Sequence, residues 1–276
     1  MGENAQKIGK KLEAVGVDIL QIFNWTVKMS DKEIKCKRSV HKNKAGNSKQ
    51  THGIDIYLEY EDPYIGKTQG VFIECKNRAW SGITKDNIEG WLTEEINLLE
   101  CAMNTPELQE FYSDDSDKNC ALILINCNDN KFDSTKFHEY LSKIQVPGKR
   151  MPYKIFIAGN DTINRWDAID KLIKEDYHNG IKVLSPSINN SQPVATKYWS
   201  INQLFSKYIF CEVEEQQEED SKGKIIRTVK KLVIFCFDKI SAESFQYMWS
   251  MCRFYQYESS YAGFEICYWT LREIPF

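Results

Sequence analysis

Two absences narrow the classes to which this chain could belong. No apolar stretch approaches the ~20 residues that a helix needs to span a bilayer. The N-terminal residues 1–11 are polar and charged, unlike the apolar centre of a secretory signal. We therefore expect a cytoplasmic protein without a membrane anchor.

Paired cysteines at metal-binding spacing are also missing. The chain has nine cysteines but no C-x-x-C pair, so a zinc ribbon is not expected. Most of the cysteines lie in apolar runs, as Cys236 does, which indicates small, buried, reduced thiols. There are only four histidines, His41, His52, His138 and His178, and their scattered positions indicate no histidine-based metal site.

What remains is the composition of a globular protein with an uneven distribution of charge. Of the 276 residues, 42% are hydrophobic and 27% are charged, and the net charge is −3; this suffices for one large or two smaller domains. Residues 28–49 hold eight cations against two acids. This basic segment is compatible with phosphate contacts or with a solvated lysine-rich loop. Acids gather instead at residues 212–220.

Two neighbouring strands are predicted to carry charges on one face. Residues 53–60 alternate in polarity, Asp62, Pro63 and Gly66 mark a turn, and residues 70–76 form a second apolar run. A hairpin symmetric about Ile65 places Asp55 roughly opposite Lys76 and near Glu74, and the last two residues share a face. Burying an unpaired charge is costly, so such groups are usually paired or bound to a metal.

Strands and helices alternate through the N-terminal two-thirds, which indicates an α/β sheet covered by helices on both faces. Residues 25–40 show weak alternation typical of one or two short strands. Helices are predicted at 4–23, 84–103, 134–144 and 161–175, and further strands at 121–125, 153–158 and 181–184.

The C-terminal part of the chain differs from the rest in amino-acid composition. Residues 185–199 are rich in Ser, Pro, Asn and Gln and are the best linker candidate. They separate a first domain, residues 1–184, from residues 200–276, which read as a small ββαβ unit rich in aromatic side chains. Those rings could stack on bases. Because cations are sparse there, we favour a core with a protein-binding surface.

The motif Gly53-Ile54-Asp55, a hairpin, Phe72-Ile73-Glu74-Cys75-Lys76 and a helix together resemble the core of the PD-(D/E)xK nuclease superfamily. The resemblance covers residues 4–130 and implies a restriction-endonuclease-like αβββαβ core. It implies Asp55, Glu74 and Lys76 as catalytic residues and gives Glu13, on the first helix, a comparable place. Ile54 stands where the nominal signature has proline.

The chemistry that the resemblance implies is metal-dependent hydrolysis of phosphodiesters. Asp55, Glu74, the Cys75 backbone carbonyl and Glu13 would hold Mg²⁺, for which Mn²⁺ could substitute. Lys76 would orient or help deprotonate the attacking water. The alternative is that these residues form no catalytic site. Glu74 and Lys76 would then be an ion pair on the surface that contributes little to stability, and Glu13 would face solvent.

We expect an endonuclease acting on DNA in restriction or phage defence. It would work in a complex, with a protein partner subunit or a second copy bound through the C-terminal unit. The alternatives are a catalytically inactive, nucleic-acid-binding scaffold that retains the fold, or a nuclease specific for RNA or branched DNA. The intact Asp55, Glu74 and Lys76 favour an enzyme over a scaffold.

Overall fold

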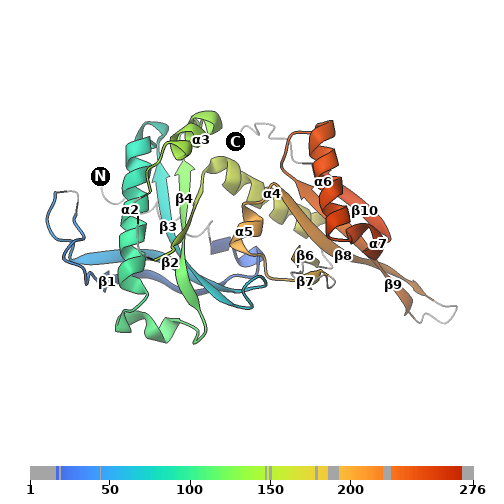
Figure 1. The fold of residues 1–276 in the computed structure, drawn as a ribbon, viewed down its shortest axis with the longest axis horizontal. Coiled ribbons are helices and arrows are strands. Elements are labelled where there is room, and N and C mark those ends of the chain that lie inside the picture. The colour runs from blue at the N-terminus through green and yellow to red at the C-terminus, as the bar shows by residue number, and fades with distance from the viewer. Residues whose placement is uncertain are drawn as a thin grey trace. The chain divides into compact units, whose positions relative to one another are not determined.

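Two compact units make up the chain, and each is built on a five-stranded sheet (Figure 1). The computed structural model describes residues 17–18, 20–43, 45–146, 148, 151–177, 180–185, 193–219 and 225–268. One unit comprises Met1–Glu61 and Lys67–Asn164, and the other comprises Asp62–Gly66 and Arg165–Phe276. Within the described residues, no helix combines the length and apolar character that crossing a bilayer requires.

The first unit is a mixed sheet flanked by helices, which confirms the predicted α/β class. Its strand order is β1-β2-β3-β4-β5; β1 runs antiparallel to β2, whereas β3, β4 and β5 run parallel to one another. In chain order the elements are β1 Thr26–Lys35, β2 Thr51–Asp62, β3 Lys67–Arg78, η1 Trp80–Gly82, α2 Lys85–Ala102, η2 Pro106–Phe111, β4 Asp117–Cys127, α3 Ser134–Ser142, β5 Lys154–Ala158 and the start of α4 Asn160–Asp176.

Strand β4 lies at the centre of the parallel part of the sheet. Its residues Ala121, Leu122, Ile123 and Leu124 are all buried, although neighbouring residues point to opposite faces of a strand. A strand covered on both faces needs apolar side chains at consecutive positions, and this explains the unbroken apolar run. Helix α2 is capped at its N-terminus by Thr84, whose hydroxyl accepts a hydrogen bond from the Asn87 amide.

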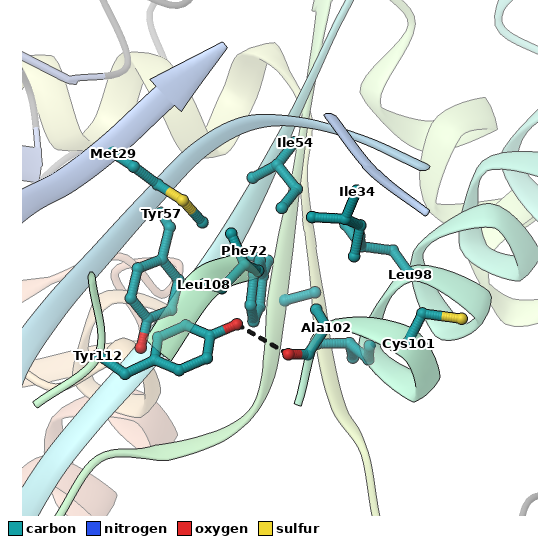
Figure 2. Close-up of a cluster of buried hydrophobic side chains, with 12 residues drawn as sticks. Met29, Ile34, Ile54, Tyr57, Phe72, Leu98, Cys101, Ala102, Leu108 and Tyr112 are labelled. Atoms are coloured by element: carbon teal, nitrogen blue, oxygen red, sulfur yellow. Dashed lines mark hydrogen bonds between the residues drawn. The ribbon is translucent and has the colours of Figure 1, made fainter. Parts of the chain in front are cut away.

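A compact aromatic cluster fixes α2 and η2 against β2 and β3 (Figure 2). The rings of Tyr57, Phe72 and Tyr112 contact one another, and the Tyr112 hydroxyl donates to the Ala102 carbonyl at 2.9 Å. Gly70 is required beside them, because a Cβ there would lie 2.0 Å from the Tyr57 hydroxyl oxygen. The cluster therefore holds the two strands that carry the candidate catalytic residues.

The second unit contains the small α+β arrangement predicted for the C-terminus. Its strand order is β10-β9-β8-β6-β7, with β10 parallel to β9 and the other neighbours antiparallel. Helix α6 contributes buried Met248 and Cys252 to its core. The elements are β6 Ile181–Ser185, β7 Val194–Thr196, α5 Ile201–Leu204, β8 Tyr208–Glu219, β9 Ile225–Cys236, α6 Ala242–Phe254, α7 Tyr257–Ser260 and β10 Gly263–Tyr268.

The division between the units differs from the predicted one. It falls within α4, between Asn164 and Arg165, rather than at residues 185–199. The reason is that β6 pairs with β8 and β7 in the second sheet, so residues before the predicted linker already belong to the second unit. Residues 186–192 lie outside the described residues, and the linker itself stays a prediction.

Two further points concern the N-terminus. Residues 25–40, predicted to hold one or two short strands, contain one strand, β1, which is longer than predicted. It contains an irregularity between Val27 and Met29 and a left-handed residue, Asp31, with φ 51°; both interrupt the alternation on which the prediction depended. Most of the predicted helix at 4–23 lies outside the described residues. Within that range, residues 17–18 and 20–22 are described and are helical.

Candidate active site

Strands β2 and β3 bring Asp55 next to the backbone of the second of the two strands. The Cys75 amide donates a hydrogen bond to Asp55 Oδ2 at 2.7 Å, so this carboxylate lies level with the residue between Glu74 and Lys76. The hairpin therefore gathers the three predicted catalytic residues within one stretch of the sheet.

Glu74 and Lys76 form an ion pair, and both side chains are largely enclosed. Their exposed fractions are 15% and 13%, unlike those of a solvated surface pair. Charges held in such a place interact more strongly than they would in water, because less solvent screens them.

Helix α2 supplies a carboxylate that the sequence analysis missed. Glu95 is 3% exposed, and its Oε2 has no hydrogen-bond partner within the described residues. Its electrostatic neighbours include Asp55, Lys76 and Glu94. A signal was present in the sequence: Glu95 interrupts the apolar stripe made by Ile88, Trp91, Leu92 and Leu99, all of which are buried.

The electrostatics of these groups have one dominant cause, which is burial. Burial raises the pKa of Asp55 above its usual range, although the Cys75 amide and Lys76 oppose the shift. Burial also raises the pKa of Glu95. Burial lowers the pKa of Lys76, although the negative charges of Asp55, Glu94 and Glu95 act to raise it. Each group thus lies where its charged form is disfavoured.

Such a set fits a divalent cation. Asp55, Glu74 and Glu95 offer three carboxylates against the single ammonium of Lys76, and all of their ligand atoms are oxygens, which Mg²⁺ and Mn²⁺ prefer. The unpartnered Oε2 of Glu95 is a buried acceptor that a cation or its bound water would satisfy. Metal ligation by Asp55 and Glu74 and by the Cys75 carbonyl stays a prediction, and so does the role of Lys76.

The remaining predicted residues are less informative. Glu13 lies outside the described residues. In the basic segment, Lys28 pairs with buried Glu59 at 3.3 Å, and the Lys32 ammonium lies over the Phe111 ring at 5.0 Å from its centroid. The charge of Lys49 favours the ionised form of Glu95. Part of the basic segment therefore lies near the candidate site.

The residues directly after Lys76 serve structural contacts. Asn77 accepts a hydrogen bond from Asn126 at 3.1 Å, and Trp80 contacts the rings of Phe132 and Tyr140. These residues therefore complete the strand and the turn after it.

Comparison with known families identifies the same part of the chain. The family model described as GAPS4 protein PD-(D/E)XK nuclease domain matches residues 1–162. No curated protein and no solved structure matches the chain. The matched residues end two positions before Asn164, the last residue of the first unit.

Proposed function

Because the chain belongs to the family of the GAPS4 protein PD-(D/E)XK nuclease domain, we propose that it is a metal-dependent endonuclease that hydrolyses phosphodiester bonds in DNA. The observation that supports this most is the grouping of Asp55, Glu74, Lys76 and buried Glu95 on β2, β3 and α2. A scaffold that only kept the fold would gain no stability from holding these charges in a place that disfavours them.

In this proposal Asp55, Glu74 and Glu95 hold Mg²⁺, with the Cys75 carbonyl and Glu13 as the other predicted ligands. The ion would lower the pKa of a bound water and offset charge on the phosphate. Hydrolysis forms one P–O bond to water and breaks the P–O bond to the leaving oxygen, which takes up a proton.

Lys76 has two tasks in that reaction. Its ammonium donates hydrogen bonds to the phosphate as negative charge builds up, a form of transition-state stabilisation. Its pKa is lowered by burial, which eases proton exchange with the attacking water. The ion pair with Glu74 holds the flexible lysine side chain in place for both tasks.

The second unit is proposed to bind a protein partner or another copy of the chain. Three aromatic side chains of α6 are exposed: Phe245 by 48%, Tyr247 by 57% and Phe254 by 79%. Aromatic side chains on a protein surface are typical of interfaces. In this proposal the chain acts within such a complex, in restriction or phage defence.

A cleavage assay tests the proposal. The full chain is incubated with linear, circular, branched and single-stranded DNA and with RNA, in Mg²⁺ and in EDTA, with Lys76→Met as the matched inactive variant. We expect Mg²⁺-dependent DNA cleavage that the variant lacks. Cleavage of RNA alone would support the RNA nuclease, and the absence of cleavage in every arm, with cell extract added, would support the scaffold.

A plating assay tests the defence role. Cells that express the wild type should reduce the plating efficiency of a panel of phages, and cells that express Lys76→Met should not. Equal plating on both strains across the panel would remove the defence role and leave the nuclease activity to be judged by the cleavage assay.

A further inference from the structure

A second group of chemically reactive side chains lies in the first unit. It consists of Cys36, which follows β1, His41 in the next loop, His52 on β2, and Cys101 near the end of α2. One ligand atom from each residue lies within 4.8 Å of all the others. Three of the four, His41, His52 and Cys101, are buried, and none of the four belongs to the candidate active site.

The distances around His41 suit a tetrahedral centre. Its Nδ1 lies 3.4 Å from the Cys36 sulfur and 3.6 Å from the Cys101 sulfur. With zinc–sulfur bonds of ~2.3 Å and zinc–nitrogen bonds of ~2.0 Å, two ligands of opposite kind in a tetrahedron are about 3.5 Å apart. Two of the distances thus already match a bound zinc ion.

His52 gives an independent observation. The side chain is 1% exposed, and neither Nδ1 nor Nε2 has a hydrogen-bond partner within the described residues. Burying two unsatisfied ring nitrogens is unfavourable, and native structures seldom do so. Its ring meets that of His41 edge to face, with centroids 5.4 Å apart, so it belongs to the same cluster.

The surroundings orient the ligands as metal sites commonly do. The far nitrogen of His41, Nε2, lies 2.7 Å from Glu100 Oε2; donation of its proton there leaves the Nδ1 lone pair facing the two sulfurs. A carboxylate behind a histidine is the usual support for a metal-bound imidazole. The Lys37 amide also donates to the Cys101 sulfur at 3.5 Å, which stabilises a thiolate.

We propose that Cys36, His41, His52 and Cys101 bind one zinc ion. Two sulfur and two nitrogen ligands in a tetrahedron favour zinc over the oxygen-seeking Mg²⁺. With four protein ligands the coordination shell is complete, so the ion is structural. This site stands whether or not the chain is a nuclease, because none of its ligands takes part in the proposed reaction.

The position of the site suggests what the ion does. His52 precedes Asp55 by three residues on β2, and Cys101 follows Glu95 by six residues on α2. A metal bound to both would hold α2 against β2 and thereby hold the candidate active-site carboxylates in register. It would also fix both ends of the lysine-rich loop between Cys36 and His52. Sequence spacing does not indicate this site, because the ligands come from four separate segments.

Metal analysis of the full chain tests this site. After dialysis against EDTA and gel filtration, elemental analysis should find about one zinc per chain, as for other closed structural sites. Cys36→Ser, His52→Ala and Cys101→Ser should each reduce the zinc content at least about fivefold. The matched controls are Cys120→Ser, another buried cysteine of the first unit, and His138→Ala, a histidine that is 59% exposed; both should keep the zinc.

A second set of measurements covers ligand variants that fail to fold. X-ray absorption of the wild type should give two sulfur and two nitrogen ligands. Co²⁺ added to the metal-free protein should give the intense visible bands of a tetrahedral thiolate site. Asp55→Asn should keep its zinc, which separates this site from the active site. Three results would overturn the proposal. The wild type could be free of zinc after expression with added zinc, peptide mapping could find a Cys36–Cys101 disulfide, or the bound zinc could have only oxygen ligands.

Discussion

The two units each bury a glutamate, and their surroundings differ. In the second unit, Glu212 on β8 is 5% exposed, and its oxygens accept hydrogen bonds from Lys230 at 2.9 Å and from Tyr261 at 3.1 Å. In the first unit, Glu95 is equally enclosed, but one of its oxygens has no partner within the described residues. Burial disfavours its charge, and although Lys76 attracts that charge, Asp55 and Glu94 repel it.

This contrast separates a structural carboxylate from one that is kept for a ligand. A carboxylate matched by donors contributes to stability, whereas one held among other acids costs stability until a cation binds. The first unit contains both kinds, since Glu59, also buried, accepts hydrogen bonds from Tyr57 and Ser113, and these lower the pKa of its carboxyl group.

The largest expected effect comes from the lysine of the first unit. Lys76→Met should reduce Mg²⁺-dependent cleavage by about 10²–10³-fold or more, the size expected when a donor to a developing charge is lost. The melting temperature in EDTA should fall, because the change leaves the enclosed Glu74 without its ion-pair partner. Cleavage kinetics and differential scanning calorimetry measure both. Unaltered cleavage would remove Lys76 from the site.

Glu95→Gln should have the next largest effect, with opposite signs for activity and stability. We expect cleavage to fall about 10–100-fold, as for other groups that support a metal site. In EDTA at pH 8 the variant should be more stable than the wild type by about 1–3 kcal/mol, the cost of burying an unmatched charge. A variant both less stable than the wild type and fully active would contradict the contrast with Glu212.

The same residue predicts a pH dependence. Burial raises the pKa of Glu95 in the folded state above the ordinary 4.5, so the folded chain holds its proton to higher pH than the unfolded chain. Wild-type stability should therefore fall relative to Glu95→Gln as pH rises above about 4.5, and the difference should level off above the folded pKa. Melting temperatures of both proteins in EDTA from pH 5 to 9 test this; a constant difference would contradict it.

Glu212→Gln serves as the matched change in the second unit. Loss of charge-assisted hydrogen bonds to Lys230 and Tyr261 should lower the free energy of unfolding by about 1–3 kcal/mol. Cleavage per folded molecule should not change. Urea unfolding monitored by fluorescence, together with the cleavage assay, measures the two quantities. An increase in stability would mean that Glu212, like Glu95, is held among charges that do not match it.

The smallest effect is expected on the exposed surface of α6. Phe254 is 79% exposed, so Phe254→Ala should alter stability by less than about 0.5 kcal/mol. Met248 is the buried comparison on the same helix. Met248→Ala should lower the free energy of unfolding by about 2–5 kcal/mol. Analytical ultracentrifugation of Phe254→Ala, alone and with candidate partners, then tests the interaction surface. Unchanged assembly would place the interface elsewhere.

The sequence predicted best what depends on local pattern. The apolar run of β4 and the stripe of α2 predicted those elements closely, and the turn at Pro63 and Gly66 predicted a hairpin that brings Asp55 to Glu74 and Lys76. Periodicity carries no information about which distant strands pair, and so β6 was expected in the first domain although it pairs with β8 in the second sheet.

The sequence predicted less of what depends on tertiary packing. Glu95 lies on an apolar stripe, and only the fold shows that its carboxylate lies near Asp55 and Lys76. The cluster of Cys36, His41, His52 and Cys101 has no local spacing that a motif could capture, because the residue after β1, a loop, strand β2 and the end of α2 bring its members together.

The most direct test of the account is a titration with Mn²⁺ followed by electron paramagnetic resonance, on zinc-loaded protein so that the Cys/His cluster does not contribute. The wild type should bind Mn²⁺ at the carboxylates of β2, β3 and α2. Asp55→Asn and Glu74→Gln should abolish or greatly weaken that binding, while Glu212→Gln should leave it unchanged. Equal Mn²⁺ affinity in all four proteins would contradict the claim that the first unit reserves its buried charges for a divalent cation.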